Sequence, residues 1–179
     1  MYDNMMNKFK FGGIDNPGIY LDETVMRMCQ THRRMFSQLA AQLINEGKYY
    51  TEIGETKKAE RYFDMARKAL AKSCKVIPAT TVPYSFNSGS IDMAESWITL
   101  GSNAEAEKIL LPMLKNIQEY VDWYLQLNDY HFTNSFDDCR YYMYQYSSAL
   151  AALKNAKSKE ADNYETNFNL RYGAMSQRM

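Results

Sequence analysis

The residues of this sequence that could carry out acid–base chemistry are Asp129 and His131, in the segment NDYHF. A carboxylate beside an imidazole can support a general base. No nucleophile is arranged with this pair locally, and we expect the segment to form a loop. Asp137 and Asp138 could act as paired carboxylates, but they stand at the start of a predicted helix, where acidic side chains cap the helix and complement its dipole. The sequence therefore predicts no catalytic residue.

The remaining histidine and the paired basic residues have structural interpretations. His32 lies on the apolar stripe of a predicted helix, so we expect a hydrogen-bonded residue in the core or at its boundary. The pairs Arg33-Arg34 and Lys57-Lys58 are isolated in the sequence and are expected on solvated faces. None of these residues indicates a metal or cofactor site, and the sequence predicts no cofactor.

Two glycine-containing elements, Gly12-Gly13 and Pro17-Gly18, precede the first predicted helix and could cradle a phosphate. They match neither a P-loop nor a dinucleotide-binding fingerprint, because the Lys-Ser/Thr pair and a preceding strand are missing. Pro17-Gly18 suits the centre of a type II turn, in which glycine tolerates the positive φ. Gly12-Gly13 would let Phe9 and Phe11 fold back on the scaffold. This stretch is therefore predicted to be an entrance to the first helix.

The three cysteines, Cys29, Cys74 and Cys139, lie far apart in the sequence. Their odd number excludes a full set of disulfides, and their separation excludes a close-spaced zinc motif. Each falls on an apolar helix stripe, where we expect a small buried hydrophobic residue rather than a reactive thiol. Buried thiols persist in both the periplasm and the cytosol, so the cysteines leave the compartment open.

The composition is that of an ordinary globular protein: 179 residues, 46% of them apolar and 23% charged, with a formal net charge of zero. This balance gives no global field that would attract nucleic acid or an anionic membrane, so no nucleic-acid partner is predicted. No apolar run approaches the roughly 20 residues of a membrane helix. The first residues lack the apolar region of a signal peptide.

The elements that must position these residues are helices, because the apolar residues recur with a period of 3.6. Asp22 is expected to cap the first helix, with Leu21 and Met26 as a hydrophobic staple. Pro112 predicts a kink or a break. The aperiodic segment 78–90 is expected to be a loop. Six apolar stripes run through residues 25–43, 59–77, 91–98, 106–127, 139–153 and 161–175.

Part of this pattern resembles a helical repeat. Small and aromatic residues stand at the spacings of a tetratricopeptide unit, in which small residues let two antiparallel helices approach and aromatic residues fill the space between them. The next pair of helices keeps Trp97, Gly101 and Ala106, with Leu110 at the aromatic position. The equivalent glycines, Gly54 and Gly101, are 47 residues apart in this sequence. A standard tetratricopeptide repeat has about 34 residues, so these repeats are irregular. The residues of the first unit are Gly47, Tyr50, Gly54, Ala59, Phe63 and Ala66.

Three segments resemble the C-terminal soluble region of a family of bacterial multi-spanning membrane proteins: FKFGGIDNPGIYLDETVMRM, CKVIPATTVPYSF and YVDWYLQL. The membrane part of that family, of unknown function, resembles protein O-mannosyltransferases. The resemblance runs from about Tyr2 to about Tyr172 and is strongest at the start. It implies a tetratricopeptide-like accessory domain on the periplasmic side of the inner membrane, with a cytoplasmic location as the alternative. The membrane spans are absent here, so no catalytic residue is carried over.

Clustered aromatic residues are the best candidates for binding. Tyrosine is abundant, with 15 residues, and clusters at 120–124 and 141–146. Tyr142 and Tyr146 share one helix face, while Tyr141 and Tyr144 point elsewhere. Tyrosine and tryptophan are favoured at interfaces because they combine contact area with a polar group. Core packing is the alternative. The predicted partner-binding surface consists of Trp123, Tyr124, Tyr141 and Tyr144.

These observations predict an all-α fold of about six helices, stacked as irregular antiparallel hairpins in a tetratricopeptide-like superhelix. Residues 1–21 are expected to form a lead-in segment and residues 22–179 a single helical domain. The predicted function is non-catalytic: an accessory domain of a glycosyltransferase-like membrane protein that binds a protein, peptide or glycan. The alternatives are a small enzyme that uses the region of Asp129 and His131, and a purely structural module without a separable ligand.

Overall fold

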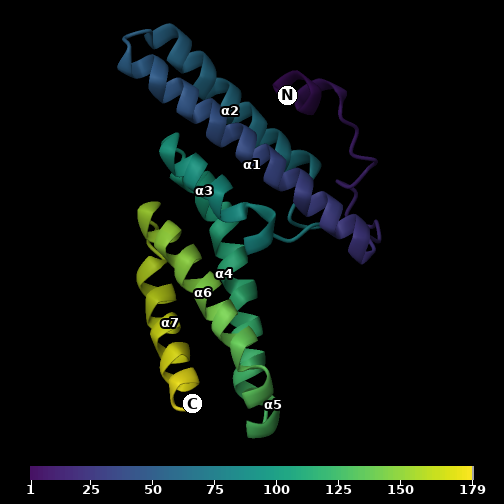
Figure 1. Ribbon diagram of the computed structural model, residues 1–179, viewed down its shortest axis with the longest axis vertical. Coiled ribbons are helices and arrows are strands. Elements are labelled where there is room, and N and C mark those ends of the chain that lie inside the picture. Colours follow the sequence, from purple (N-terminus) through teal and green to yellow (C-terminus); the bar gives the residue numbers. More distant parts are fainter. Residues whose placement is uncertain (179) are drawn as a thin grey trace. The chain divides into compact units, whose positions relative to one another are not determined.

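The computed structural model describes residues 1–178, and this part of the chain is all-helical, as predicted, without a strand. The chain divides into two compact units, one formed by residues Met1–Ser102 and the other beginning at Asn103 (Figure 1). A π-helical turn η1 (Asn4–Lys8) and a 3₁₀ turn η2 (Phe86–Ser88) accompany the α-helices. The α-helices are α1 (Glu23–Glu52), α2 (Thr56–Val76), α3 (Ser90–Thr99), α4 (Asn103–Gln126), α5 (Asp129–Asn134), α6 (Phe136–Asn155) and α7 (Ala161–Ser176).

The helix α1 begins where the sequence predicts. Asp22 is its N-cap, and its carboxylate accepts a 2.8 Å hydrogen bond from the backbone nitrogen of Val25. Leu21 and Met26, the residues of the expected staple, both pack against the same core cluster, which is formed by Cys29, Ile77 and Val82. The start of α1 is thus fixed by a polar cap on one side and by apolar packing on the other.

In the first unit, α1 and α2 form a close antiparallel hairpin (Figure 1). Gly47 on α1 faces the ring of Phe63 on α2 so closely that a Cβ atom there would lie 2.5 Å from the ring. A small residue therefore lets the helices approach, and an aromatic residue fills the space beside it, as predicted. At the end of α1, Gly54 has a φ of 80°, a left-handed conformation that glycine adopts without steric cost.

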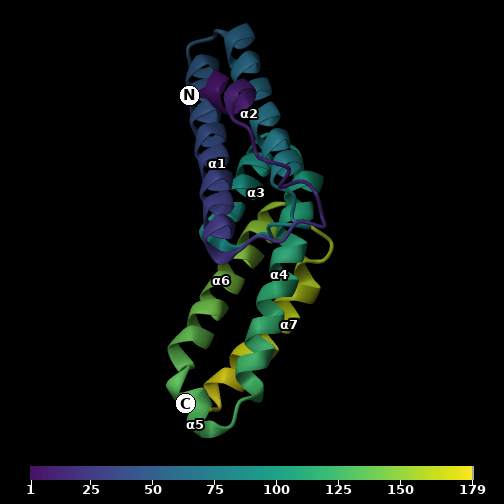
Figure 2. The same cartoon turned by 90° about the vertical axis from the view of Figure 1, so that its right-hand side faces the viewer.

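The N-terminal segment folds back on the hairpin, as the glycine pair predicts. Figure 2 shows it beside α2 before the chain enters α1, and Lys72 of α2 donates a hydrogen bond to the Met6 carbonyl. The rings of Phe9 and Phe11 both meet His32 edge-on, at 6.1 Å between centroids. His32 is half-buried, and its Nδ1 lies 2.8 Å from the Met28 carbonyl oxygen, so its predicted boundary role is confirmed.

The predicted type II turn at Pro17-Gly18 is wrong in type. A turn is present, because the Ile19 backbone nitrogen donates to the Asn16 carbonyl at 3.1 Å. Gly18, however, does not have the positive φ that a type II turn requires. The Asn16 side chain explains the difference: its Oδ1 accepts a 3.1 Å hydrogen bond from the Gly18 backbone nitrogen, an Asx-type contact that fixes the turn locally.

The prediction that Arg33 lies on a solvated face is also wrong. Its side chain is fully buried, and its guanidinium group donates hydrogen bonds to three backbone carbonyls, those of Ile77, Val82 and Pro83, while it lies over the Tyr84 ring. Burial lowers the pKa of this guanidinium group. Arg34 is exposed, as expected, and donates to the Asn87 carbonyl.

The segment 78–90 is a loop, as predicted, apart from the 3₁₀ turn η2. Its end lies against α1 at Gly89, whose φ is 70° and whose Cβ position would be 3.2 Å from the Arg34 Cα. Only glycine combines this backbone conformation with so close an approach. α3 follows directly and packs on α1.

In the second unit, α4 packs against α6 and α7, and α5 packs against α6 (Figure 1). α4 continues through Pro112, so the break that this residue could have caused does not occur. Pro112 is exposed, so its ring does not have to fit into the packed side of the helix. α5 was not predicted: His131 lies on this short helix rather than in a loop.

The thiols lie mostly inside the structure. Cys29 and Cys139 are buried, as predicted, and burial raises the pKa of each. Cys74 is half-buried and accepts a 3.7 Å hydrogen bond from the Tyr84 hydroxyl. None of the three is in a disulfide within the described residues. Over residues 1–178, no helix has the length and apolar character needed to cross a membrane.

The boundary after Ser102 falls between α3 and α4, which are the two helices of the second predicted repeat. The single domain over residues 22–179 and the tetratricopeptide-like superhelix therefore stay predictions. The all-helical class and the close α1–α2 hairpin are established by the structure.

Candidate aromatic binding site

Aromatic side chains of α4 and α6 meet in a continuous set of ring contacts in the second unit. Tyr120 of α4 stacks on Tyr142 of α6 with 4.7 Å between ring centroids. Tyr142 also contacts Tyr124 at 5.8 Å, and Tyr124 meets Trp123 edge-on at 4.8 Å. Tyr141 contacts Tyr142 at 6.3 Å. The partly buried tyrosines at the centre thus hold the outer rings in defined positions.

The predicted partner-binding residues differ in their exposure. Trp123 is 56% exposed and Tyr144 is 61% exposed, and Tyr141 is also exposed. Tyr124 is half-buried, because it packs between Trp123 and Tyr142. The structure brings Trp123, Tyr124 and Tyr141 into the set of ring contacts. Three of the four predicted side chains therefore offer a large area to solvent.

A hollow of about 430 Å³ lies beside Trp123 on α4. Its other lining residues are Asn116, Glu119, Tyr120 and Tyr124, and Tyr120 is 45% exposed. The hollow thus combines aromatic rings with one amide and one carboxylate. Asn116, Glu119 and Tyr120 were not predicted as binding residues. Helical spacing could have revealed them: Glu119 and Tyr120 precede Trp123 by four and three residues, and Asn116 precedes it by seven, so all three share a helix face with Trp123.

The helix α4 is held in place by polar contacts beneath this surface. The Tyr146 hydroxyl of α6 is buried, accepts a 2.6 Å hydrogen bond from Gln118 Nε2 and donates to the Tyr164 carbonyl at 2.9 Å. Burial raises the pKa of Tyr146 to about 12. Arg171 of α7 donates to the Asp122 carboxylate at 2.7 Å. These contacts join α4 to both helices behind it.

Two tyrosines of the ring cluster, Tyr124 and Tyr142, are held in their neutral form. Burial raises the pKa of Tyr124, and the nearby charge of Asp138 adds to this effect. Burial also raises the pKa of Tyr142, together with the neighbouring rings and Asp138. A neutral phenol can both donate and accept a hydrogen bond, so the cluster offers polar contacts as well as ring faces.

Asp129 and His131 are both exposed side chains of α5. The Asp129 carboxylate is exposed and accepts a 3.0 Å hydrogen bond from Arg178. His131 is exposed, and its ring meets Tyr130 edge-on at 5.3 Å. Arg178 also binds the C-terminal end of α4, because it donates to the carbonyl of Leu125 in the last turn and to that of Leu127 just after the helix.

The other charged candidates are also accounted for by local structure. Asp137 and Asp138 are exposed in the first turn of α6, where a helix dipole favours acidic side chains. Asp137 forms an ion pair with Arg140 at 3.0 Å. Lys58 pairs with Glu55 at 2.6 Å on an exposed face, as expected for Lys57-Lys58. Over residues 1–178, no group of three His, Cys, Asp or Glu side chains is placed to hold a metal ion.

Comparisons of this chain with protein-family models, with curated proteins and with solved structures find no match.

Proposed function

We propose that this chain is a non-catalytic interaction domain that binds a glycan on the aromatic face of α4. The observation that supports this function is the hollow beside Trp123, which joins exposed aromatic rings to the side chains of Asn116 and Glu119. A pyranose ring presents apolar C–H groups on one face and hydroxyl groups around its edge. Aromatic faces suit the C–H groups, while an amide and a carboxylate suit the hydroxyl groups.

The size and rigidity of the hollow fit this partner. Its volume of about 430 Å³ lies within the range of roughly 300–1,000 Å³ that is usual for small-ligand sites. Tyr120 and Tyr124 are held by Tyr142 on the neighbouring helix, so their rings need little ordering when a ligand binds. Preorganised rings of this kind lose less entropy on binding than flexible chains do.

The proposed setting is an accessory domain of a glycosyltransferase-like membrane protein, on the periplasmic side of the inner membrane. This part of the proposal rests on the resemblance of the three segments described above, and the absence of a membrane-spanning helix within residues 1–178 is compatible with it. The coding sequence upstream of Met1 tests it directly. Membrane spans encoded there would support the setting, whereas a start codon preceded by a non-coding region would contradict it.

The glycan proposal is tested by titrating a panel of soluble oligosaccharides into the 15N-labelled chain and following its amide resonances. We expect at least one oligosaccharide to shift amides of α4 around Glu119 and Trp123. Trp123→Ala should weaken that binding at least tenfold. Tyr130→Ala removes a comparably exposed ring from α5, outside the hollow, and should leave the affinity unchanged.

Three outcomes would contradict the proposal: no oligosaccharide shifts the α4 amides, Trp123→Ala binds as well as the parent chain, or both variants weaken binding equally. Thermal unfolding of each variant confirms that the fold is intact, since Trp123 is largely exposed and its loss should change stability little. A peptide that shifts these amides while every oligosaccharide fails would replace the glycan with a peptide partner.

A further inference from the structure

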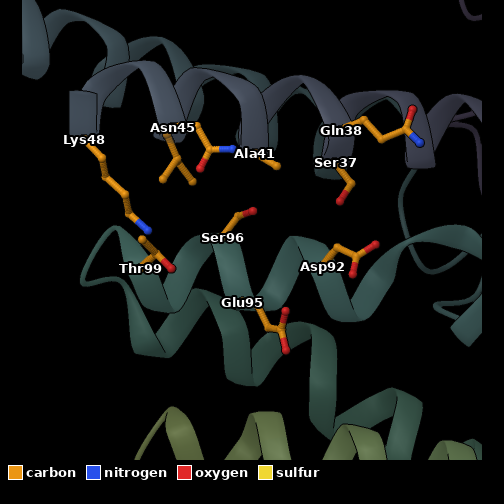
Figure 3. Close-up of a pocket in the computed structure, with 10 residues that line it drawn as sticks. Ser37, Gln38, Ala41, Asn45, Lys48, Asp92, Glu95, Ser96 and Thr99 are labelled. Carbon is orange, nitrogen blue, oxygen red and sulfur yellow. The ribbon is translucent and has the colours of Figure 1, made fainter. Parts of the chain in front are cut away.

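The first unit contains a second hollow, of a different character, between α1 and α3 (Figure 3). Its volume is about 280 Å³, and most of its lining side chains are polar. α1 and α3 run in the same direction here, because Ser37 lies opposite Asp92 and Lys48 lies near Thr99. We call this feature the α1–α3 groove. Its residues play no part in the aromatic site, which is built entirely from the second unit.

Ser37 is the unusual residue of the α1–α3 groove. It is only 1% exposed, yet its hydroxyl has no hydrogen-bond partner. Figure 3 shows the side chain directed from α1 into the space toward α3. A buried hydroxyl without a partner lowers the stability of the fold, so native structures rarely leave one unpaired without a reason. A ligand group in the groove would provide the missing partner.

The α1–α3 groove has opposite charges at its two ends. Asp92 lies opposite Ser37 at one end, and the Lys48 side chain reaches toward Thr99 at the other (Figure 3). Within the described residues, neither Asp92 nor Lys48 has an ion-pair partner within 4.0 Å. A ligand with a positive charge at one end and a negative charge at the other could therefore pair with Asp92 and with Lys48.

The middle of the groove supplies neutral polar groups. Ser96 of α3 is nearly buried and points toward α1, and Asn45 lies across from it (Figure 3). Hydroxyl and amide groups such as these bind a polar spacer better than a hydrocarbon chain. Glu95 adds negative charge on the rim of the groove, where burial and the charge of Asp92 raise the pKa of its carboxyl group. The acidic end thus has a negative field that favours a cation.

We propose that the α1–α3 groove binds a short zwitterion with a polar spacer, of the chemical class of a free tripeptide. The ammonium group of the ligand forms an ion pair with the Asp92 carboxylate and donates one hydrogen bond to the Ser37 hydroxyl. The carboxylate lies at Lys48 and accepts a hydrogen bond from the Thr99 hydroxyl. Spacer amides meet Ser96 and Asn45.

The length of the α1–α3 groove sets the size of this ligand. Asp92 and Thr99 are seven positions apart, which is about 10 Å along a helix with a rise of 1.5 Å per residue. An extended tripeptide spans about 10 Å at 3.3–3.6 Å per residue. The small volume, about 280 Å³, favours small side chains such as those of glycine and alanine.

The test is a titration of the 15N-labelled full chain with triglycine, which combines the required charges with the smallest spacer. We expect triglycine to shift amides of α1 and α3 around Ser37, Ser96 and Thr99. N-acetyltriglycine lacks the ammonium group and triglycine amide lacks the carboxylate, so each should bind at least tenfold more weakly. Asp92→Asn and Lys48→Met should weaken triglycine binding to the same degree.

The pairing of charges is tested by combining ligand and protein changes. In Asp92→Asn, the preference for triglycine over N-acetyltriglycine should shrink at least severalfold, because the ammonium group loses its carboxylate partner and keeps only the contact with Ser37. Ser37→Ala should weaken triglycine severalfold without lowering the melting temperature, since it removes an unpaired hydroxyl. Glu52→Gln and Lys57→Met change exposed charges outside the groove and serve as matched controls with unchanged affinity.

Several outcomes would overturn the proposal: no amide shifts at millimolar triglycine, capped peptides that bind as well as triglycine, or control variants that weaken binding as much as Asp92→Asn. Melting curves show whether each variant is folded. Because the aromatic site lies in the other unit, oligosaccharide binding by Trp123→Ala and triglycine binding by Asp92→Asn can fail independently of each other.

Discussion

Arg33 Nη2 donates a 2.9 Å hydrogen bond to the carbonyl oxygen of Ile77, the C-cap residue directly after α2. The same guanidinium group reaches the carbonyls of Val82 at 2.5 Å and Pro83 at 3.0 Å. This buried guanidinium group, which forms no ion pair with a carboxylate among residues 1–178, thus joins α1 to both ends of the segment 77–83. Ile77 and Val82 are fully buried, and buried backbone acceptors need donors, which the guanidinium group supplies.

Arg33→Met should destabilise the protein by about 2–4 kcal/mol, because it leaves three carbonyls without their donor. Urea denaturation followed by circular dichroism measures this loss. Arg27→Met is the matched control: Arg27 is an exposed residue of the same helix that pairs with Glu23, and its loss should cost less than about 1 kcal/mol. Equal effects of the two substitutions would show that the buried hydrogen bonds contribute nothing specific.

Gly47→Ala should destabilise the α1–α2 hairpin by about 1–3 kcal/mol, because the new methyl group would overlap the Phe63 ring. The cost should shrink in a Phe63→Ala background, where the ring is absent. Gly173→Ala provides the opposite case: Gly173 is inside α7 with nothing within 4 Å of its Cβ position, so alanine should stabilise by about 0.5–1 kcal/mol. Chemical denaturation that gives the two substitutions the same sign would refute this account.

Alkaline pH should weaken the second unit through Tyr146. Its pKa in the folded state is about 12, above the value of about 10 in an unfolded chain, because its buried phenol resists ionisation. The neutral phenol therefore stabilises the fold fully below pH 10, and this contribution is lost as the pH rises from 10 to 12. Two pKa units correspond to about 2–3 kcal/mol.

The free energy of unfolding, measured in urea from pH 9 to pH 12, tests this expectation. Tyr146→Phe should be less stable at pH 9, because Gln118 loses its acceptor and the Tyr164 carbonyl loses its donor. The difference between the two proteins should narrow above pH 10, since only the parent chain loses the contribution of a neutral Tyr146. A constant difference across this pH range would be inconsistent with the buried phenol as the cause.

The sequence was enough to predict the longer α-helices because their signals are local, whereas the six-residue helix α5 is too short to show an apolar period. The Asp22 cap and the glycines at 54 and 101 mark helix ends through chemistry within a few residues, and the apolar period identifies the faces between them. The burial of Arg33 could not be predicted this way. Its acceptors lie 44 to 50 residues away in the sequence, and a pair of arginines has the same local pattern whether it is solvated or buried.

Of the two candidate sites, one could be predicted from the sequence and the other could not. Trp123 and Tyr141 could be selected from composition and helical spacing, because exposed aromatic residues cluster in the sequence. The α1–α3 groove could not, because it joins residues of α1 to residues of α3 that lie more than 40 positions further along the chain. Ser37 and Asp92 are ordinary surface residue types, and only the fold shows that they face each other.

The glycine pair at 12 and 13 gives the N-terminal segment a definite handedness. Both residues have positive φ angles, 59° and 78°. D-amino acids prefer this region of backbone conformation, whereas L-amino acids disfavour it. An achiral residue in the sequence therefore occupies a chiral conformation in the fold. D-alanine would favour a positive φ at either position, whereas L-alanine would disfavour it. The contacts of Phe9 and Phe11 with His32 therefore depend on two residues that can adopt a positive φ.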